Sequence, residues 1–355
     1  MRYGFNRGID RHETNSHKYD FALQLGYSES GEEYFAAVAG WHERQFGWKA
    51  EAEWLVKTPG IAFAIAAAIR AFTKEGEAVL IQQPVYSPFS EVIKDNNRVV
   101  VNSPLILRDG HYEIDFADFE DKIITGQVKL FLLCSPHNPV GRVWQEEELR
   151  RIGEICLKHR VLVVSDEIRS DFVYSGHQHR VFSALTADLA EITITCTSPS
   201  KTFNLAGLQI SNVFIANRDL KERFMAAIPD TGYSQINQKG LAACQAAYQT
   251  GAEWLDQLKE YLRGNLIFVR EYLKKNLPEI KLIEPEGTDL LWLDFRSLQM
   301  TEAQRAQLLM KDAAIWSDSG AVFGSDGEGF EHINLACPRA VLHQSLIRLE
   351  KVVHN

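Results

Sequence analysis

Three polar groups that could do chemistry together follow strand-like apolar runs in the middle of the chain. Asn138 lies in the turn SPHNPVG, directly after the run FLLC. Asp166 lies near the end of RVLVVSDE, and Lys201 ends the segment TITCTSPSK. A lysine amine can bond covalently to a carbonyl compound and transfer protons, and nearby cationic or apolar groups lower its pKa for this work. The three residues are therefore candidates for one chemical site if the fold brings them together.

Each of the three residues also has an ordinary structural interpretation when it is taken alone. Asn138 precedes a proline, and Asn-Pro is common in turns. Asp166 could cap a helix or form half of an ion pair. A lone lysine such as Lys201 is usually a solvated surface residue. The functional interpretation depends on all three lying at strand ends of one α/β unit.

The elements that would position these residues are apolar strands that alternate with helical stretches between about residues 55 and 215. Several strand candidates are nearly continuous in Val, Ile and Leu, as is typical of strands covered by helices on both faces. This alternation predicts βαβ units and a mostly parallel sheet, in which ligands bind at the carboxyl ends of the strands. Helices are expected within 58–72, with Gly60 at the start, and over 145–159. The predicted strands are residues 78–82, 98–101, 128–134, 160–167, 192–196 and 212–216.

The character of the sequence changes after about residue 235. Residues 236–276 are rich in helical periodicity, and the tail mixes helices with the short strand candidates DLLWLDF and HINLA. We expect a large α/β domain over residues 27–235. The smaller α+β domain would combine residues 1–26 with residues 236–355.

Composition narrows the classes of protein that this chain can belong to. Its 355 residues are 45% hydrophobic, and its net charge of −9 argues against a nucleic-acid partner. It has no apolar run of about 18 residues and no apolar signal-peptide core, so we expect no membrane partner. Its five cysteines are widely spaced and without a C-x-x-C pair, which predicts neither disulfides nor a metal site. These features favour a cytoplasmic protein.

Six longer motifs are distributed over nearly the whole chain. They are TPGI (58–61), QPVYSPF (83–89), SPHNPVGRVW (135–144), SDEIRSDF (165–172), SPSKTFNLAGLQ (198–209) and GFEHINLACPR (329–339). In this order they resemble the fold-type I, class I/II aminotransferase superfamily of enzymes that use pyridoxal 5′-phosphate (PLP). The branch that they resemble most contains cystathionine β-lyases of the MalY/PatB type and related C-S lyases. The resemblance implies an α/β PLP-dependent transferase fold.

The resemblance also implies roles for four residues around the cofactor ring. Lys201 would form a Schiff base with PLP and then serve as the base that moves the Cα proton of the substrate. Asp166 would keep the pyridine nitrogen protonated, which makes the ring an electron sink. Asn138 would bond the 3-oxygen of the ring, and Tyr86 would stack on the ring face. Lys201, Asp166 and Tyr86 are therefore the catalytic residues that we expect.

Further residues are implied for the cofactor phosphate and for the substrate. Backbone N–H groups of Gly60 and Ile61, at a helix N-terminus, would bind the phosphate. Ser198 and Ser200 would add hydroxyl donors, and Tyr27 would reach the phosphate from a neighbouring subunit, which implies a homodimer.

Arg339 would bind the substrate α-carboxylate through a bidentate pair. Arg339 could alternatively form a structural ion pair, and Tyr27 and Tyr86 could be ordinary core or interface aromatics.

The chain departs from the family pattern at three places. The position three residues after Asp166 is often Tyr in transaminases and His in the lyase branch, and here it is Arg169. Gln209 replaces an arginine that transaminases commonly use for the phosphate, which favours a lyase. HKYD (17–20) is followed within a few residues by Gly26-Tyr27, without the family's W-V-A-D-M-D-F-like stretch. PLP binding is expected to survive this shortening, whereas specificity, dimer packing or activity could change.

The leading functional hypothesis is a C-S β-lyase that acts on cystathionine or a cysteine S-conjugate and yields a thiol, pyruvate and ammonia. An amino-acid aminotransferase that uses the same residues is the alternative. A PLP-binding regulator or an inactive relative is a third possibility, which the acidic composition disfavours. A nicotinamide or P-loop protein is disfavoured because the glycine motifs of those folds are not found in the required context.

Overall fold

The computed structural model describes residues 30–233 and 235–354 of the chain. Its main element is a seven-stranded sheet with the order β1-β9-β8-β7-β6-β2-β3. The strands from β8 to β3 pair in parallel, whereas β9 and β1 are antiparallel to their neighbours. The predicted mostly parallel sheet is confirmed, and each of the six predicted strands differs from the observed one by at most two residues at either end. The strands are β1 (Leu55–Thr58), β2 (Ala78–Ile81), β3 (Val99–Asn102), β6 (Leu130–Cys134), β7 (Leu162–Asp166), β8 (Thr193–Thr197) and β9 (Ser211–Phe214).

Alternate residues of the central strands enter two separate apolar cores, because successive side chains of a strand point to opposite faces. Leu130 and Leu132 of β6 pack on one face, and Phe131 and Leu133 pack on the other. Helices cover both faces, which explains why the strands are almost continuously apolar. One face carries α2 (Ile61–Phe72), α3 (Pro88–Asp95) and α8 (Arg218–Ala227), and the other carries α4 (Phe116–Thr125), α5 (Glu146–His159) and α6 (Ala187–Glu191).

A further apolar cluster joins the first described helix to a helix from much later in the chain. Trp41 of α1 (Glu32–Phe46) stacks on Tyr248 of α9 (Gln238–Thr250), with ring centroids 5.4 Å apart. The cluster also includes Phe214 of β9, so α9 is tied to the large sheet although it follows residue 235. The expected domain boundary at that residue stays a prediction, and residues 1–26 lie outside the described part of the chain.

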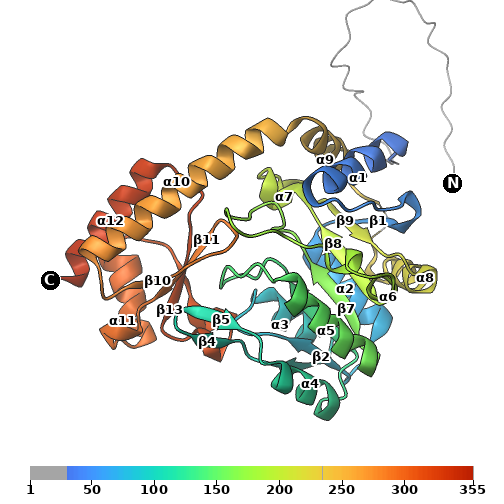
Figure 1. The fold of residues 1–355 in the computed structure, drawn as a ribbon, viewed down its shortest axis with the longest axis horizontal. Helices are drawn as coiled ribbons and strands as arrows, with labels where there is room; N and C mark the ends of the chain where they lie inside the picture. The colour runs from blue at the N-terminus through green and yellow to red at the C-terminus, as the bar shows by residue number, and fades with distance from the viewer. Residues whose placement is uncertain (1–29, 234, 355) are drawn as a thin grey trace, which may run out of the picture.

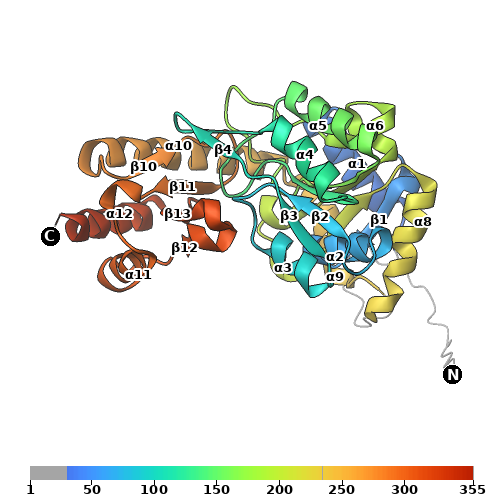
Figure 2. The same ribbon diagram turned by 90° about the horizontal axis from the view of Figure 1, so that it is seen from below.

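A second, antiparallel sheet has the order β10-β11-β13-β12. Leu291 and Leu293 of β11 face a core formed with the C-terminal helices, whereas Trp292 faces the core of the large sheet. Figure 2 shows this smaller part beside the large sheet, and Figure 1 shows that the long helix α10 extends from one to the other. The elements are α10 (Ala252–Asn276), β10 (Lys281–Ile283), β11 (Leu290–Asp294), α11 (Glu302–Ala306), β12 (Asp318–Ser319), β13 (Phe330–Asn334) and α12 (Arg339–Val353).

Two short elements complete the arrangement around the strand ends. The hairpin β4 (Ile106–Arg108) and β5 (His111–Glu113) follows β3, and the single-turn helix α7 (Pro199–Thr202) follows β8. None of the helices within the described residues has the length and apolar character needed to cross a membrane.

Candidate active site

A cavity of about 220 Å³ lies at the carboxyl ends of β6, β7 and β8, where the fold class predicts a ligand site. Asn138 follows β6, Asp166 ends β7, and Lys201 follows β8. The three residues line this one cavity, so the structure brings together the groups that the sequence only suggested. The other predicted residues among its lining are Gly60, Ile61, Tyr86, Ser198 and Ser200.

Asp166 is a buried carboxyl group, 4% exposed, at the inner end of the cavity. Burial raises its pKa to about 6, although the Arg169 and Lys201 charges act in the opposite direction. Its Oδ1 atom accepts a hydrogen bond from the Ile168 N–H at 3.1 Å. A buried carboxylate that accepts so few hydrogen bonds lowers the stability of the protein unless a cationic donor binds it. The site therefore favours a ligand that presents a cationic donor to Asp166.

Lys201 is held beside Asp166 by the short helix α7. The neighbouring Thr202 hydroxyl donates to Asp171 Oδ2 at 2.6 Å, and Trp41 Nε1 donates to Asp171 Oδ1 at 3.0 Å. Partial burial and the Arg169 charge lower the pKa of Lys201, and Asp166 acts in the opposite direction. A lowered pKa increases the fraction of neutral amine, which is the form that attacks a carbonyl carbon.

The start of α2 forms one wall of the cavity and provides a site for an anion. Gly60 has a φ of 115° and a ψ of 162°, a backbone conformation that is essentially restricted to glycine. The first N–H groups of an α-helix have no intrahelical acceptors, and they attract anions. Ile61 is the first residue of α2. The Gly60 N–H is less available than expected, because it donates to Ser211 Oγ at 3.2 Å.

The two predicted serines differ in how their side chains are used. Ser198 caps α7: its hydroxyl donates to the Ile210 carbonyl at 2.7 Å and accepts from the Ser200 N–H at 3.1 Å. Its proton is therefore engaged within the protein. Ser200 lines the cavity at the start of α7, where its hydroxyl would be the better donor to an anion.

Asn138 and Tyr86 lie on the wall formed by the loops after β2 and β6. The Tyr86 N–H donates to the Asn138 carbonyl at 3.0 Å, which fixes the two residues relative to each other. The Asn138 amide oxygen is buried and has no hydrogen-bond partner among the described residues. A buried polar atom without a partner is costly, so a ligand group is expected to satisfy it.

Two predicted site residues are not brought to this cavity by the described part of the chain. Tyr27 lies outside the described residues. Arg339 begins α12, where its Nε donates to Asn265 Oδ1 at 2.8 Å and its guanidinium lies 5.7 Å from the Phe268 ring centroid. It is not among the residues that line the cavity, and its surroundings are those of a structural arginine.

Two of the three departures from the family pattern, Arg169 and Gln209, line the cavity, and the third lies outside the described residues. Arg169 forms a buried ion pair with Asp289, which directly precedes β11. No sequence pattern pointed to Asp289, because it belongs to no recognised motif and lies far from Asp166 along the chain.

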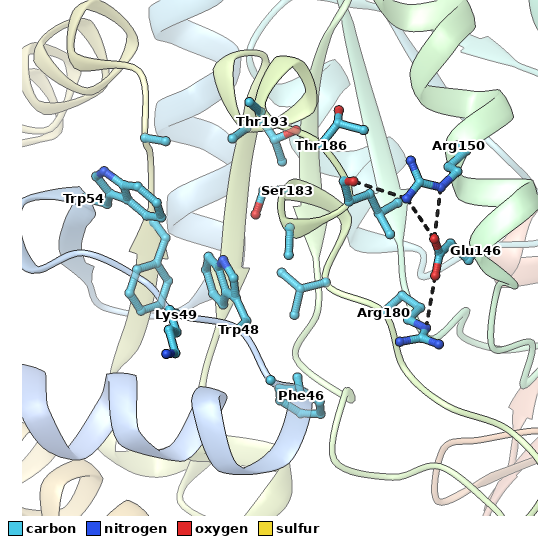
Figure 3. A pocket seen from close by; sticks show the side chains of 18 residues that line it. Phe46, Trp48, Lys49, Trp54, Glu146, Arg150, Arg180, Ser183, Thr186 and Thr193 are labelled. Carbon is cyan, nitrogen blue, oxygen red and sulfur yellow. Dashed lines mark hydrogen bonds and ion pairs between the residues drawn. The ribbon is translucent and has the colours of Figure 1, made fainter.

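A larger cavity, of about 560 Å³, lies elsewhere on the large sheet, near the amino end of β8 (Figure 3). Aromatic side chains such as Trp48 and Trp54 form part of its wall. Arg150 and Arg180 both pair with Glu146, so one carboxylate offsets part of their combined charge. Lys201 and Asp166 are not among its lining residues, and the smaller cavity therefore carries the chemistry that the sequence indicates.

An α/β fold that presents a lysine of lowered pKa, a buried carboxyl group and a helix N-terminus around one cavity defines an enzyme site for carbonyl chemistry on an anionic cofactor. The comparison with known families identifies the group to which such a site belongs. The chain is a member of the class I and II aminotransferase family, whose model matches residues 22–349.

Curated relatives within this family include two bacterial proteins of similar length. Cystathionine beta-lyase PatB of Bacillus subtilis is 40% identical over 326 residues, covering 92% of this chain and 84% of the relative. Protein MalY of Escherichia coli is 32% identical over 328 residues, covering 92% and 83% of the two chains.

Solved structures resemble the whole described fold. Cystalysin from Treponema denticola, which contains a PLP cofactor, is 40% identical with a TM-score of 0.92, covering 94% of this chain and 84% of its own. A PLP-bound putative aminotransferase from Clostridium difficile is also 40% identical, with a TM-score of 0.91 and coverage of 93% and 85%.

Proposed function

We propose that this protein is a PLP-dependent carbon-sulfur β-lyase that acts on cystathionine or a related cysteine S-conjugate. In this reaction the conjugate and one water molecule yield a thiol, pyruvate and ammonia. The observation that carries the proposal is the meeting of Lys201, Asp166 and Asn138 in one cavity, in a chain 40% identical to a cystathionine beta-lyase.

The residues present fit PLP group by group. The buried Asp166 carboxylate matches the ring nitrogen, and the side-chain amide of Asn138 matches the 3-oxygen. Ile61 and Ser200, at the start of two helices, match the phosphate. Tyr86 supplies an aromatic face beside these groups. When bound, PLP supplies an electron sink for the charge that develops on the substrate Cα.

The chain's own residues then have distinct tasks. The Lys201 amine is the attachment point for the cofactor, and once released it takes the proton from the substrate Cα. Asp166 remains ionised against the ring nitrogen, so that electron density is drawn away from Cα while the β-thiol leaves. Lys201 then holds a proton beside the departing sulfur, where it can neutralise the thiolate.

An aminotransferase is the alternative, and a specific observation keeps it open. A PLP-bound structure that is 40% identical is described as a putative aminotransferase. The same residues would serve, but the proton would be returned to the cofactor and a keto acid released. The two functions differ in one requirement: a transaminase turns over only when a second keto acid is supplied, with ping-pong kinetics.

Assembly and location complete the proposal. We infer a homodimer, since the resemblance assigns Tyr27 to the phosphate of a neighbouring subunit. We place the enzyme in the cytoplasm, because the five cysteines are free and four of them are buried, in keeping with a reducing compartment. The division into residues 27–235 and residues 1–26 with 236–355 is kept as a proposal.

The attachment of the cofactor can be tested directly. PLP-loaded protein is reduced with borohydride, digested and mapped by mass spectrometry, and the modified peptide is expected to contain Lys201. Lys201→Ala should lose both the modification and pyruvate release from L-cystathionine. Lys274→Ala, at an exposed position in the last turn of α10, is the control that should keep both. Modification of a different lysine, with unchanged turnover by Lys201→Ala, would refute the proposal.

A further inference from the structure

Arg169 is the only arginine among the described residues that line the cavity of Lys201. It is 8% exposed, and its one hydrogen bond within the described residues is donated from Nη1 to Asp289 Oδ1. A guanidinium group has five N–H donors. The ion pair with Asp289 therefore leaves several donors for a ligand in the cavity.

The charges around the cavity leave Arg169 with a task that no other lining residue in the described part of the chain can perform. Among the described residues that line the cavity, two have cationic side chains, Lys201 and Arg169. Under the proposed function Lys201 is committed to the cofactor, and Asp166 is committed to the ring nitrogen. An amino-acid substrate adds an α-carboxylate, and a carboxylate that is taken out of water without a cationic partner is strongly disfavoured. Arg169 is the remaining cation.

Asp289 holds this arginine in place from the second sheet. Its carbonyl accepts from the Leu335 N–H at 2.9 Å, and the preceding Thr288 N–H donates to the Phe172 carbonyl at 2.7 Å. Asp289 is thereby fixed to both β13 and the loop after β7. A guanidinium held on one side by a carboxylate presents its other N–H groups in a fixed plane, which suits bidentate binding of a second carboxylate.

The neighbourhood of Arg169 contains a second site that an anion would stabilise. His332 on β13 is 8% exposed, its Nδ1 bonds Asp318 Oδ2 at 3.2 Å, and its Nε2 has no partner among the described residues. Burial and the Arg169 charge lower the pKa of His332 to about 4, although Asp318 acts in the opposite direction. A carboxylate bound to Arg169 would offset the charge of that arginine and so remove one cause of the lowered pKa of His332.

We propose that Arg169, held in place by Asp289, binds the α-carboxylate of the amino-acid substrate. This inference rests on the proposed function, because it takes the substrate to be an amino acid. It assigns to Arg169 the role that sequence reasoning gave to Arg339.

The experiment compares two ligands that differ only in the carboxylate, L-alanine and L-alaninamide. Their dissociation constants are measured from the change in cofactor absorbance of the PLP-loaded protein, so no turnover is needed. Arg169→Met should weaken the binding of L-alanine by roughly 10- to 100-fold, the range for a charge-assisted hydrogen bond. It should weaken the binding of L-alaninamide by less than about threefold. Arg169→Lys should recover only part of the loss, because lysine cannot form the bidentate pair.

Two further variants keep the result interpretable. Removing Arg169 alone leaves Asp289 buried and unpaired, so the double variant R169M/D289N provides the same test in a neutral site. Arg296→Lys alters an arginine paired with Asp294 at the other end of β11, with 2.8 Å between Nη2 and Oδ2, and should leave both dissociation constants unchanged.

Each outcome supports or overturns the assignment. Loss of discrimination between the two ligands in Arg169→Met and in R169M/D289N supports it. Equal weakening of the binding of both ligands would overturn it. A changed cofactor spectrum with discrimination intact would also overturn it, because Arg169 would then contact the cofactor. If no conjugate is cleaved but discrimination depends on Arg169, the lyase proposal fails and this inference stands.

Discussion

At the scale of single residues, the site is built around a carboxyl group that is expensive to bury. Burial raises the pKa of Asp166 from 3.8 to about 6 in the protein without a cofactor. Because the folded-state pKa lies above the unfolded-state value, the protonated form stabilises the folded state below about pH 4. That contribution is lost as the pH rises through about 6, and it corresponds to about 3 kcal/mol. The cofactor nitrogen is the partner that would compensate for this cost.

Asp166→Asn should therefore separate stability from activity. The cofactor-free variant is expected to be more stable than the wild type at pH 8, by up to about 3 kcal/mol, with the difference vanishing near pH 4. Its lyase activity should fall at least about 100-fold, because the ring nitrogen loses its anionic partner. Urea unfolding at both pH values measures the first effect, with the exposed Asp121→Asn as control. A variant less stable than the wild type at pH 8 would contradict the account.

The meeting of the proposed catalytic residues in one cavity could be predicted from sequence because each lies in a short motif next to a strand. Asn138, Asp166 and Lys201 needed only the rule that parallel strands present their carboxyl ends at one edge of a sheet. Asp289 could not be predicted, since its role depends on how the second sheet packs against the turn that carries Arg169. Arg339 was expected in the site from its motif, but it begins α12, and hydrogen bonding to Asn265 keeps it beside α10.

At the scale of elements, the position of Lys201 depends on how one short helix is anchored. Helix α7 has a single turn, which is too short to be stable alone. It is connected to α1 through Asp171, which accepts from both the Thr202 hydroxyl and Trp41 Nε1. Asp171 is buried, and burial raises its pKa. The hydrogen bonds that Asp171 accepts from Thr202 and Trp41 therefore help to keep α7 in place.

Thr202→Val should weaken this anchor without changing the shape of the side chain. We expect a loss of about 1.5–3 kcal/mol in the free energy of unfolding, the range for a hydrogen bond to a charged group, and a lower kcat. Chemical unfolding and steady-state kinetics measure the two effects. The control is Thr125→Val on the exposed end of α4, where the hydroxyl bonds only a helix carbonyl. Equal losses in the two variants would rule out a special role for Thr202.

The start of α2 depends on a backbone conformation that only glycine adopts easily. A Cβ atom at Gly60 would meet no atom within 4 Å, so the cost of Gly60→Ala is backbone strain alone. That strain is about 1–3 kcal/mol, and we expect PLP affinity to fall by roughly 5- to 100-fold as the first N–H groups shift. Titration of the cofactor-free protein with PLP measures this affinity, and Gly31→Ala is the control. Unchanged affinity would show that the phosphate binds elsewhere.

At the scale of the whole molecule, the cavity depends on two sheets that meet around the loop after β6. Arg142 in this loop is 3% exposed and donates to Glu148, to the Tyr112 carbonyl and to Glu286. Glu286 lies between β10 and β11 of the second sheet, and its N–H donates to the Gly141 carbonyl at 2.9 Å. Arg142 thus connects the large sheet to the segment that leads to Asp289.

Arg142→Met should be strongly destabilising, because it leaves two carboxylates without their buried partner. The expected loss is about 3–5 kcal/mol in the free energy of unfolding. Arg150→Met removes an exposed pair with Glu146 and should cost no more than about 1 kcal/mol. Denaturant unfolding followed by tryptophan fluorescence compares them, and similar values would contradict the role given to Arg142.

The sequence predicted more about the large sheet than about the molecule as a whole. Apolar periodicity was enough for the parallel strands, and motif order placed the proposed site at their carboxyl ends. They do not record the packing of α9, which follows the expected boundary, on α1, and the boundary itself stays a prediction. Such contacts depend on packing between segments about 200 residues apart, as in the hydrogen bond from the Tyr34 hydroxyl to Cys244 Sγ, and no local pattern records them.

The central claim is that this cavity cleaves a carbon-sulfur bond with PLP. A single-turnover reaction of the PLP-loaded protein with L-cystathionine, in which both the product and the cofactor are analysed, tests it most directly. The account predicts one equivalent of pyruvate and a cofactor that is recovered as PLP. Pyridoxamine phosphate without pyruvate would contradict it and would identify the protein as an aminotransferase.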